Sequence, residues 1–361
     1  MNSVRKGELE FVDVRLEHAH ARDPVFVSAS FIPDRALMLF QARAQFPDGR
    51  EFDVLAAPSR SEAAKALDGG PQDVMGNASF SFGAALLAPY ANRIRGKYSA
   101  ESRTIETLIG GRQLRLPANG GGNEPGAEKY AIHGLILARP AEEVQVEGGK
   151  TVALVSGRIR AGDFGVQWPS ATDIQIRWEL RPDALSVHLT VQNVGNEDLP
   201  IGVGWHPYFA LPSAMRQQAR LHVPARSRVV VNNYDDVLPT GEISAVAATR
   251  FDFRAAGGAA LGDQYLDDCF VDLEKSSSGE TICQLIDPAA RYGLRIRSLS
   301  PEISAIQTFT RPDRPFVVIE PQFNWADPYG PEWGQDRRTG MVVLRPMQKV
   351  EYAVVLEMFT P

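Results

Sequence analysis

Two of the six histidines stand where a strand pattern meets a glycine or a proline. His133 lies in "YAIHGLI" and His206 in "VGWHPYFAL", each after an apolar approach. Such a place is typical of a strand end, where a side chain is held yet accessible. Imidazole exchanges protons near neutral pH, so the two are candidates for acid–base catalysis as well as for a structural role. The other four lie in polar or uninformative surroundings: His18, His20, His188 and His222.

The strand that leads to His206 has small residues on one face. Side chains along a strand point to opposite faces in turn, so Trp205 belongs to the apolar face, whereas Gly202, Gly204 and His206 share the other. We therefore expect Trp205 in the core, and open space on the glycine face in front of His206.

A carboxylate follows four apolar residues in "FVVIEPQ". This residue is Glu320, and Pro321 after it stops the strand ladder. Burying a carboxylate is costly unless the group is paired or its pKa rises. Glu320 is therefore either half of a structural salt bridge or a general base tuned by its surroundings.

Two further motifs carry charge. In "APYANRIRGKY", Arg93, Arg95 and Lys97 share one face if the segment is a strand, where they could bind a ligand or only protect a solvated edge. Asp267 and Asp268 in "YLDDCF" could likewise be a polar strand start. Taken together, a histidine pair, a buried carboxylate and arginines on strands supply acid–base chemistry that needs no cofactor.

The patterns of other chemistries are absent from the sequence. It has no HExxH or CxxC spacing, no GxSxG elbow and no Walker or Rossmann glycine fingerprint. Its only cysteines, Cys269 and Cys283, are too few for a disulfide framework or a four-thiolate zinc site. The net charge of −6, with no basic block, argues against a nucleic-acid partner. We expect no metal and no cofactor, in a reducing compartment.

Short alternating strands dominate the elements that must position these side chains. "DIQIRWEL" and "LSVHLTV" alternate strictly, and similar runs continue to the C-terminus. In "SRSEAAKALDGG", Ser59 and Glu62 instead have the spacing of a helix capping box. The glycine-rich stretch from Pro117 to Lys129 predicts a long loop. The sequence therefore predicts an all-β protein, a large antiparallel β-sandwich with few short helices.

The domain organisation expected from the sequence is simple. Residues 1–39 form an N-terminal segment packed on or beside the main domain, and residues 40–361 form a single β-sandwich domain. No apolar run approaches the length of a membrane span, and the N-terminus lacks the apolar core of a signal peptide. We therefore expect a cytoplasmic protein with no membrane partner, as a monomer or homodimer.

The ordered set of motifs resembles that of aldose 1-epimerases, also called mutarotases. The motifs run from about Phe40 to the C-terminus in the family's order: "PYANRIRGKY", "IHGL", "GWHPYFAL", "VLPTGE", "FDFR", "LDDCF" and "FVVIEPQ". The resemblance implies a galactose mutarotase-like β-super-sandwich with an open groove for a free sugar, and an isomerase without metal or cofactor.

The resemblance also implies a role for each motif residue. Glu320 would remove the proton of the anomeric hydroxyl while His206 protonates the ring oxygen, and closure of the opened sugar on its other face gives the other anomer. The implied substrate contacts are Arg93, His133, Asp267 and Gln307, with Asp268 as an uncertain neighbour.

This mechanism sets conditions on the site. His206 must start protonated and Glu320 ionised, and a nearby negative charge could raise the His206 pKa. The Gly202 and Gly204 face would leave room for the sugar ring. Phe164 or Trp168 could stack on that ring, although we expect core packing for at least one of the two.

The sequence departs from the galactose-type pattern of the family at Leu135 and Pro207, and the loop around Gly120 looks longer. The implied substrate is therefore an unphosphorylated aldose of open identity. One alternative is a hexose-6-phosphate 1-epimerase, whose phosphate would need cations such as Arg95, Lys97 or Arg139. The other is a non-catalytic carbohydrate-binding protein on the same scaffold.

Overall fold

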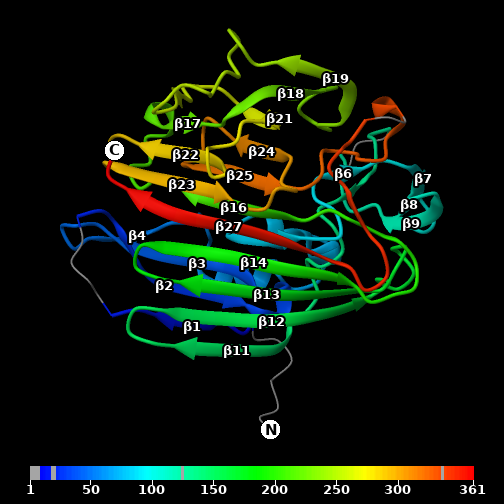
Figure 1. Cartoon of the computed structure of the whole chain (residues 1–361), viewed down its shortest axis with the longest axis horizontal. Coiled ribbons are helices and arrows are strands. Elements are labelled where there is room, and N and C mark those ends of the chain that lie inside the picture. Colours follow the sequence, from blue (N-terminus) through cyan, green and yellow to red (C-terminus); the bar gives the residue numbers. More distant parts are fainter. Residues whose placement is uncertain (1–8, 18–21, 123–125, 335–336) are drawn as a thin grey trace.

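Alternating apolar residues give each strand one core-facing side, and the computed structural model assembles these strands into two large antiparallel sheets. It describes residues 9–17, 22–122, 126–334 and 337–361. The two sheets lie face to face, with the nine-stranded sheet in front in Figure 1. The predicted all-β sandwich is therefore confirmed.

The eleven-stranded sheet has the order β1 (Val12–Arg15), β2 (Val25–Ile32), β3 (Met38–Gln45), β5 (Ala84–Leu87), β16 (Gly204–Ala210), β25 (Phe316–Gln322), β24 (Ala305–Thr310), β21 (Leu266–Leu273), β18 (Ala225–Val231) and β19 (Pro239–Ala245), with β4 (Glu51–Asp53) paired to β3. The nine-stranded sheet has the order β11 (Glu142–Gly148), β12 (Ala153–Gly162), β13 (Thr172–Leu180), β14 (Ala184–Asn193), β27 (Lys349–Phe359), β23 (Tyr292–Ser298), β22 (Thr281–Asp287), β17 (Arg220–His222) and β20 (Ala259–Ala260).

Smaller elements surround the sandwich. Three small sheets pair β6 (Arg93–Ile94) with β10 (Ala131–Ile132), β15 (Leu199–Ile201) with β26 (Val342–Leu344), and β7 (Lys97–Ser99) with β8 (Thr104–Ile109) and β9 (Arg112–Pro117). The helical elements are α1 (Arg60–Ala66) and the short 3₁₀ helices η1 (Pro33–Arg35), η2 (Val74–Phe80), η3 (Arg216–Gln218) and η4 (Pro331–Trp333). None of the described helices is long and apolar enough to cross a membrane.

Large aromatic side chains fill the space between the two sheets. Trp178 of β13 packs against Trp205 of β16, with ring centroids 5.8 Å apart, and against Phe31 of β2 at 5.5 Å. The hydroxyl of Tyr352 in β27 donates a hydrogen bond of 2.8 Å to the carbonyl of Pro321 in β25. Trp205 is therefore in the core, as its place in the alternating strand predicts.

Two local predictions are confirmed. The Ser59 hydroxyl accepts a bond from the Glu62 amide at 3.3 Å, and the Glu62 carboxylate accepts one from the Ser59 amide at 2.9 Å, so the capping box begins α1. The described part of the glycine-rich stretch after β9 is a loop, in which Gly120 forms an isolated bridge with Tyr130 and the Asn119 side chain bonds to the backbone of Ile132 in β10.

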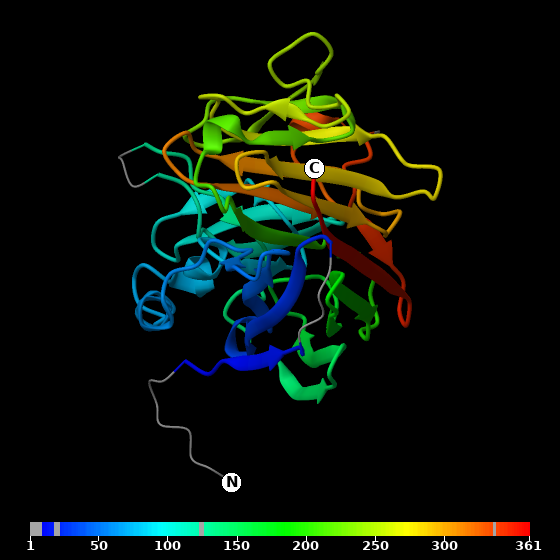
Figure 2. The same ribbon diagram turned by 90° about the vertical axis from the view of Figure 1, so that its left-hand side faces the viewer.

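The N-terminal strands belong to the large sheet. β1 pairs with β2 and β2 with β3, so residue 40, the expected domain boundary, falls inside β3. Seen from the side in Figure 2, the cyan part of the chain, which includes β5 and β6, lies on the opposite side of the molecule from the red strand β27. That side carries the predicted catalytic residues.

Candidate active site

The register of four neighbouring strands gathers the predicted polar residues. Gly204 pairs with Gln322 and Tyr208 with Val318, which sets His206 of β16 opposite Glu320 of β25. Glu320 pairs in turn with Gln307 of β24. Asp267 of β21 lies opposite Phe309, one step along the same face. Because the alternate residues Trp205, Ile306 and Ile319 fill the core, these polar side chains project from the outer face of the eleven-stranded sheet.

The two-stranded sheet β6–β10 brings the remaining predicted residues over this face. Arg93 pairs with Ile132, and the His133 amide then donates a 2.9 Å bond to the carbonyl of Asn92. Both Asn92 and His133 adopt left-handed backbone conformations, with φ of 61° and 60°. These are turn conformations that residues other than glycine seldom adopt, and here the surrounding fold imposes them.

The gathered side chains touch one another. His206 Nε2 lies 3.3 Å from Glu320 Oε1, and the His133 and His206 rings meet edge to face with centroids 4.9 Å apart. Gln307 Nε2 donates a 2.5 Å bond to Asp267 Oδ1, and Arg93 Nη2 lies 3.5 Å from Asp267 Oδ2. All six predicted site residues therefore form one cluster: Arg93, His133, His206, Asp267, Gln307 and Glu320.

Two buried amides that the sequence reasoning missed complete the cluster. Asn92 Nδ2 donates to Gln307 Oε1 at 3.0 Å, which fixes the amide of Gln307 with its nitrogen toward Asp267. Gln322 Nε2 donates to Glu320 Oε2 at 2.9 Å. Strand alternation could have indicated Gln322, because it lies two residues after Glu320 on the same face.

Burial dominates the proton affinities of the acid–base pair. It raises the pKa of Glu320 well above its ordinary value, and the nearby Asp267 carboxylate adds to this rise, whereas Gln322 and Arg93 oppose it. Burial also lowers the pKa of His206 to about 3, with a further contribution from Arg93. Burial therefore moves the His206 pKa in the direction opposite to the rise that a nearby negative charge could give.

The other two titrating residues follow the same pattern. Burial lowers the pKa of His133, and the neighbouring His206 and Arg93 lower it further. Burial raises the pKa of Asp267, against the effects of Arg93 and Gln307. In the absence of a ligand, the cluster thus favours neutral imidazoles, because both are 5% exposed and charged forms are costly at that depth.

The expected open space beside the glycines is also wrong. A methyl group at Gly204 would lie 2.9 Å from Ala91 Cβ and 3.3 Å from Gln322 Cγ, and one at Gly202 would collide with the Asn324 amide. The glycines therefore make room for protein side chains, Gln322 and Asn324 above all, and not for a ligand.

The predicted stacking residues lie elsewhere. Phe164 and Trp168 are buried between the sheets, where Trp168 stacks on Tyr90 at 5.5 Å and its Nε1 donates to the carbonyl of Pro200 at 2.6 Å. The aromatic side chains at the histidines are instead Phe80 of η2, 4.6 Å from the His133 ring, and Tyr208, stacked on His206 at 5.2 Å. No sequence signal marks Phe80, because η2 is an irregular segment.

The other charged residues that the sequence analysis considered do not join the cluster. Asp268 accepts bonds from Arg228 at 2.9 Å and from the Tyr234 hydroxyl at 3.0 Å. Arg95 is paired with Asp327 at 2.7 Å and with Glu332 at 2.5 Å. The other two cations also lie apart: exposed Lys97 is in β7, and Arg139 donates to the Leu135 carbonyl and lies over Phe164.

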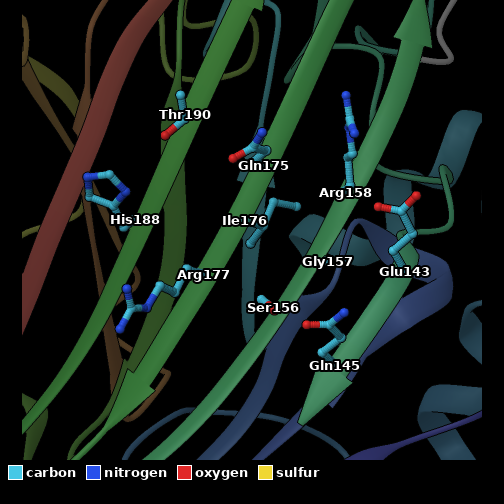
Figure 3. A pocket seen from close by; sticks show the side chains of 10 residues that line it. All are labelled: Glu143, Gln145, Ser156, Gly157, Arg158, Gln175, Ile176, Arg177, His188 and Thr190. Carbon is cyan, nitrogen blue, oxygen red and sulfur yellow. The ribbon is translucent and has the colours of Figure 1, made fainter. Parts of the chain in front are cut away.

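A hollow lies on the outer face of the nine-stranded sheet, away from the cluster. Figure 3 shows polar side chains of β11 to β14, among them Arg158, Gln175, Arg177 and His188, on the outer face of the nine-stranded sheet. Arg158 pairs with Asp173 at 2.6 Å, and Arg177 with Glu179 at 3.5 Å. Its charges are thus paired along the sheet, and none of the predicted site residues lines it.

The clustered motif residues agree with a family comparison. A family model described as aldose 1-epimerase matches residues 56–356. The chain belongs to the aldose 1-epimerase family. The resemblance inferred from the motifs is therefore confirmed, and the matched region contains all six clustered residues. No group of three or more potential metal ligands of the His, Cys, Asp and Glu types occurs among the described residues.

Solved structures show the same fold at low sequence identity. A galactose mutarotase-like protein from Clostridium acetobutylicum is 18% identical, with a TM-score of 0.73, over 98% of this chain and 99% of that one. A GalM/aldose epimerase homologue from C. elegans is 17% identical, with a TM-score of 0.69, over 98% and 99%. A galactose 1-epimerase from Lactobacillus acidophilus NCFM is 17% identical, with a TM-score of 0.65, over 97% and 99%.

One curated relative matches only locally. A stretch of 43 residues is 51% identical to the uncharacterized protein YphB of Escherichia coli (strain K12). The match covers 12% of this chain and 15% of that protein. The evidence for the family thus comes from the family model, and that for the fold from the solved structures.

Proposed function

We propose that this protein is an aldose 1-epimerase that interconverts the α and β anomers of a free, uncharged aldose. The observation that carries the proposal is the contact between His206 and Glu320, 3.3 Å apart on one sheet face beside a cluster of hydrogen-bonding side chains. Ring opening needs one group that takes a proton from the anomeric hydroxyl and another that gives one to the ring oxygen. A carboxylate next to an imidazole supplies both.

The proton affinities favour one end of this reaction, the form after ring opening. With His206 protonated and Glu320 ionised, the pair is ready to open the ring. After opening, Glu320 holds the proton and His206 is neutral, and this is the form that burial favours. Both forms carry one proton between the two groups, so the reaction moves protons without changing the net charge of the buried pair.

The remaining cluster suits sugar hydroxyls. Arg93 and His133 would donate to hydroxyl oxygens, and Asp267 would accept from hydroxyl protons while Gln307 holds its carboxylate in place. In this proposal Arg93, His133, Asp267 and Gln307 orient the ring so that its anomeric centre faces the adjoining Glu320 and His206 side chains.

The charge around the cluster favours an uncharged sugar over a 6-phosphate. Two carboxylates, Glu320 and Asp267, face a single guanidinium, that of Arg93. The cations that a phosphate would need are paired or distant, since Arg95 binds Asp327 and Glu332. A hexose-6-phosphate epimerase is therefore the weaker alternative, and a non-catalytic sugar-binding protein would not require the acid–base pair.

The proposal is tested by the exchange between anomers at equilibrium, measured by NMR magnetisation transfer on glucose, galactose, a hexose 6-phosphate and an acidic hexose. Protein-dependent exchange of a neutral aldose is expected, with most of the rate lost in Glu320→Gln and in His206→Asn, each removing about 10²–10⁴-fold. His133→Asn is the matched histidine control and should lose less.

Two outcomes would contradict the proposal. Sugar binding without exchange would favour the binding-protein alternative, and exchange confined to the 6-phosphate would favour the phosphohexose epimerase. A normal rate in His206→Asn would move the acid role to His133.

A further inference from the structure

We propose that Gln322 is a positioning residue that holds the Glu320 carboxylate for its work as a base. The proposal rests on the function proposed above and adds a residue to the machinery. Gln322 Nε2 donates to Glu320 Oε2 at 2.9 Å, and the other oxygen, Oε1, is the one that lies 3.3 Å from His206 Nε2. The amide thus takes one carboxylate oxygen and leaves the other directed at the acid–base partner.

The local backbone makes this contact possible. Glu320 and Gln322 are two residues apart on β25, so both project from the same sheet face. Gly204 lies opposite Gln322 on β16, and its missing side chain leaves the space in which the Gln322 stem packs. Neither residue has an exposed surface above 1%, so no water competes with the amide for the carboxylate.

The contact also explains how a carboxylate this deep can ionise. A donor that bonds to the charged form of an acid favours that form. Gln322 and Arg93 are the two groups that favour the ionised Glu320, against burial and the Asp267 charge. The other polar or titratable groups around Glu320 are His206 of β16, Tyr208 of β16, Cys269 of β21 and Tyr352 of β27.

The side-chain amide of Gln322 makes no other hydrogen bond in the described structure. Gln322 Oε1 is buried without a hydrogen-bond partner in the described structure. A residue placed only for packing would not leave a polar atom unpaired, because a buried polar atom without a partner is destabilising. The bond to Glu320 is the one polar contact that accounts for glutamine at this site.

The direct test is a pH titration of the Glu320 carboxyl carbon by ¹³C NMR, with its signal assigned from Glu320→Gln. In Gln322→Met, which keeps the volume and removes the donor, the midpoint should rise by about one unit or more, equivalent to about tenfold in proton affinity. Gln322→Glu, a nearly isosteric change that is expected to fold, should raise it too, since a second carboxylate disfavours ionisation. Gln41→Met is the control, because Gln41 bonds only to its own strand and to Leu55.

Activity gives a separate readout. If the proposed function is right, kcat in Gln322→Met should fall about tenfold or more at neutral pH and recover as pH rises, while KM changes little. An unchanged Glu320 titration in both Gln322 variants would overturn the positioning role whether or not the protein epimerises sugars. A shifted titration in a protein without anomer exchange would keep the contact and reject the proposed function.

Discussion

At the scale of single residues, the buried carboxyl group of Glu320 makes the folded protein less stable than a neutral side chain at that position would. Glu320 is 1% exposed; Gln322 donates a hydrogen bond to its carboxylate, and His206 Nε2 lies 3.3 Å from its other oxygen. Such a group is retained for its chemistry, because a neutral side chain of the same shape would fold more stably.

This argument predicts that Glu320→Gln stabilises the protein as pH rises. The folded-state pKa lies above the ordinary 4.5, so both states are protonated at lower pH and the mutation has little pH-dependent effect there. Above that value the unfolded chain releases its proton first, which costs the wild type stability until the folded-state pKa is passed. The Tm of Glu320→Gln should therefore exceed that of the wild type by about 1–3 °C near pH 7.5.

Scanning calorimetry at several pH values measures this difference. The two Tm values should converge near pH 4.5, where the unfolded wild type also keeps its proton. A difference that stays constant from pH 4.5 to pH 7.5 would contradict a raised Glu320 pKa.

Residue chemistry could be read from the sequence where it depended on local pattern. Glu320 and His206 end apolar runs, and the resemblance to the family's motifs indicated Arg93, Asp267 and Gln307 as site residues. That Gln322 and Asn324 fill the space beside Gly204 and Gly202 could not be read from the sequence, because they belong to β25 and to the bend after it, more than 100 positions away. The sequence also did not show how deeply the site is buried, and this burial lowers the pKa of His206.

At the scale of elements, η2 covers the histidine pair. Phe80 at its end packs on His133 at 4.6 Å and on His206 at 6.0 Å, and its carbonyl accepts a 2.9 Å bond from the Tyr208 hydroxyl. A sugar bound against the histidines and Glu320 would touch this half-buried ring, and aromatic faces stack on the apolar faces of sugar rings.

We therefore expect Phe80→Leu to raise KM about three- to tenfold with a smaller effect on kcat, because a stacked aromatic contributes about 0.5–1.5 kcal/mol. Phe82→Leu is the matched control: two residues on, its ring is buried against Phe40 at 6.1 Å and faces another cluster. KM values from anomer exchange measure the effect. Equal KM values for the two variants would show that η2 serves only stability.

Elements with a regular alternation of apolar and polar residues, or with a clear helix cap, could be predicted from the sequence. Short elements that form only through contacts with distant parts of the chain could not. The strict alternation in β13 and β14 and the Ser59 cap of α1 were visible in the sequence. The two-residue strands β6 and β10 were not, although they deliver Arg93 and His133 to the site. Their pairing depends on left-handed backbone conformations at Asn92 and His133, which Asn and His adopt more often than most residues but too seldom for the residue type alone to predict them.

At the scale of the whole molecule, the site depends on the contact between the two sheets. Its residues sit on the outer face of the eleven-stranded sheet, and the inner face of that sheet packs on the other sheet through Trp205, Trp178 and Phe31. Trp178 also donates through Nε1 to the Leu37 carbonyl at 3.0 Å. One continuous core therefore joins the sheets, and they should unfold together.

Trp178→Leu tests this coupling. The change removes the ring that contacts both Phe31 and Trp205 and leaves the Leu37 carbonyl unpaired, so it should lower the free energy of unfolding by about 2–4 kcal/mol. Arg177→Ala, on the same strand with 58% of its side chain exposed, should change it by less than about 0.5 kcal/mol. Urea unfolding followed by far-UV circular dichroism and by fluorescence should give coincident transitions in all three proteins. Separate transitions would mean that the sheets are independent units, and that a defect in the nine-stranded sheet would leave the active-site face intact.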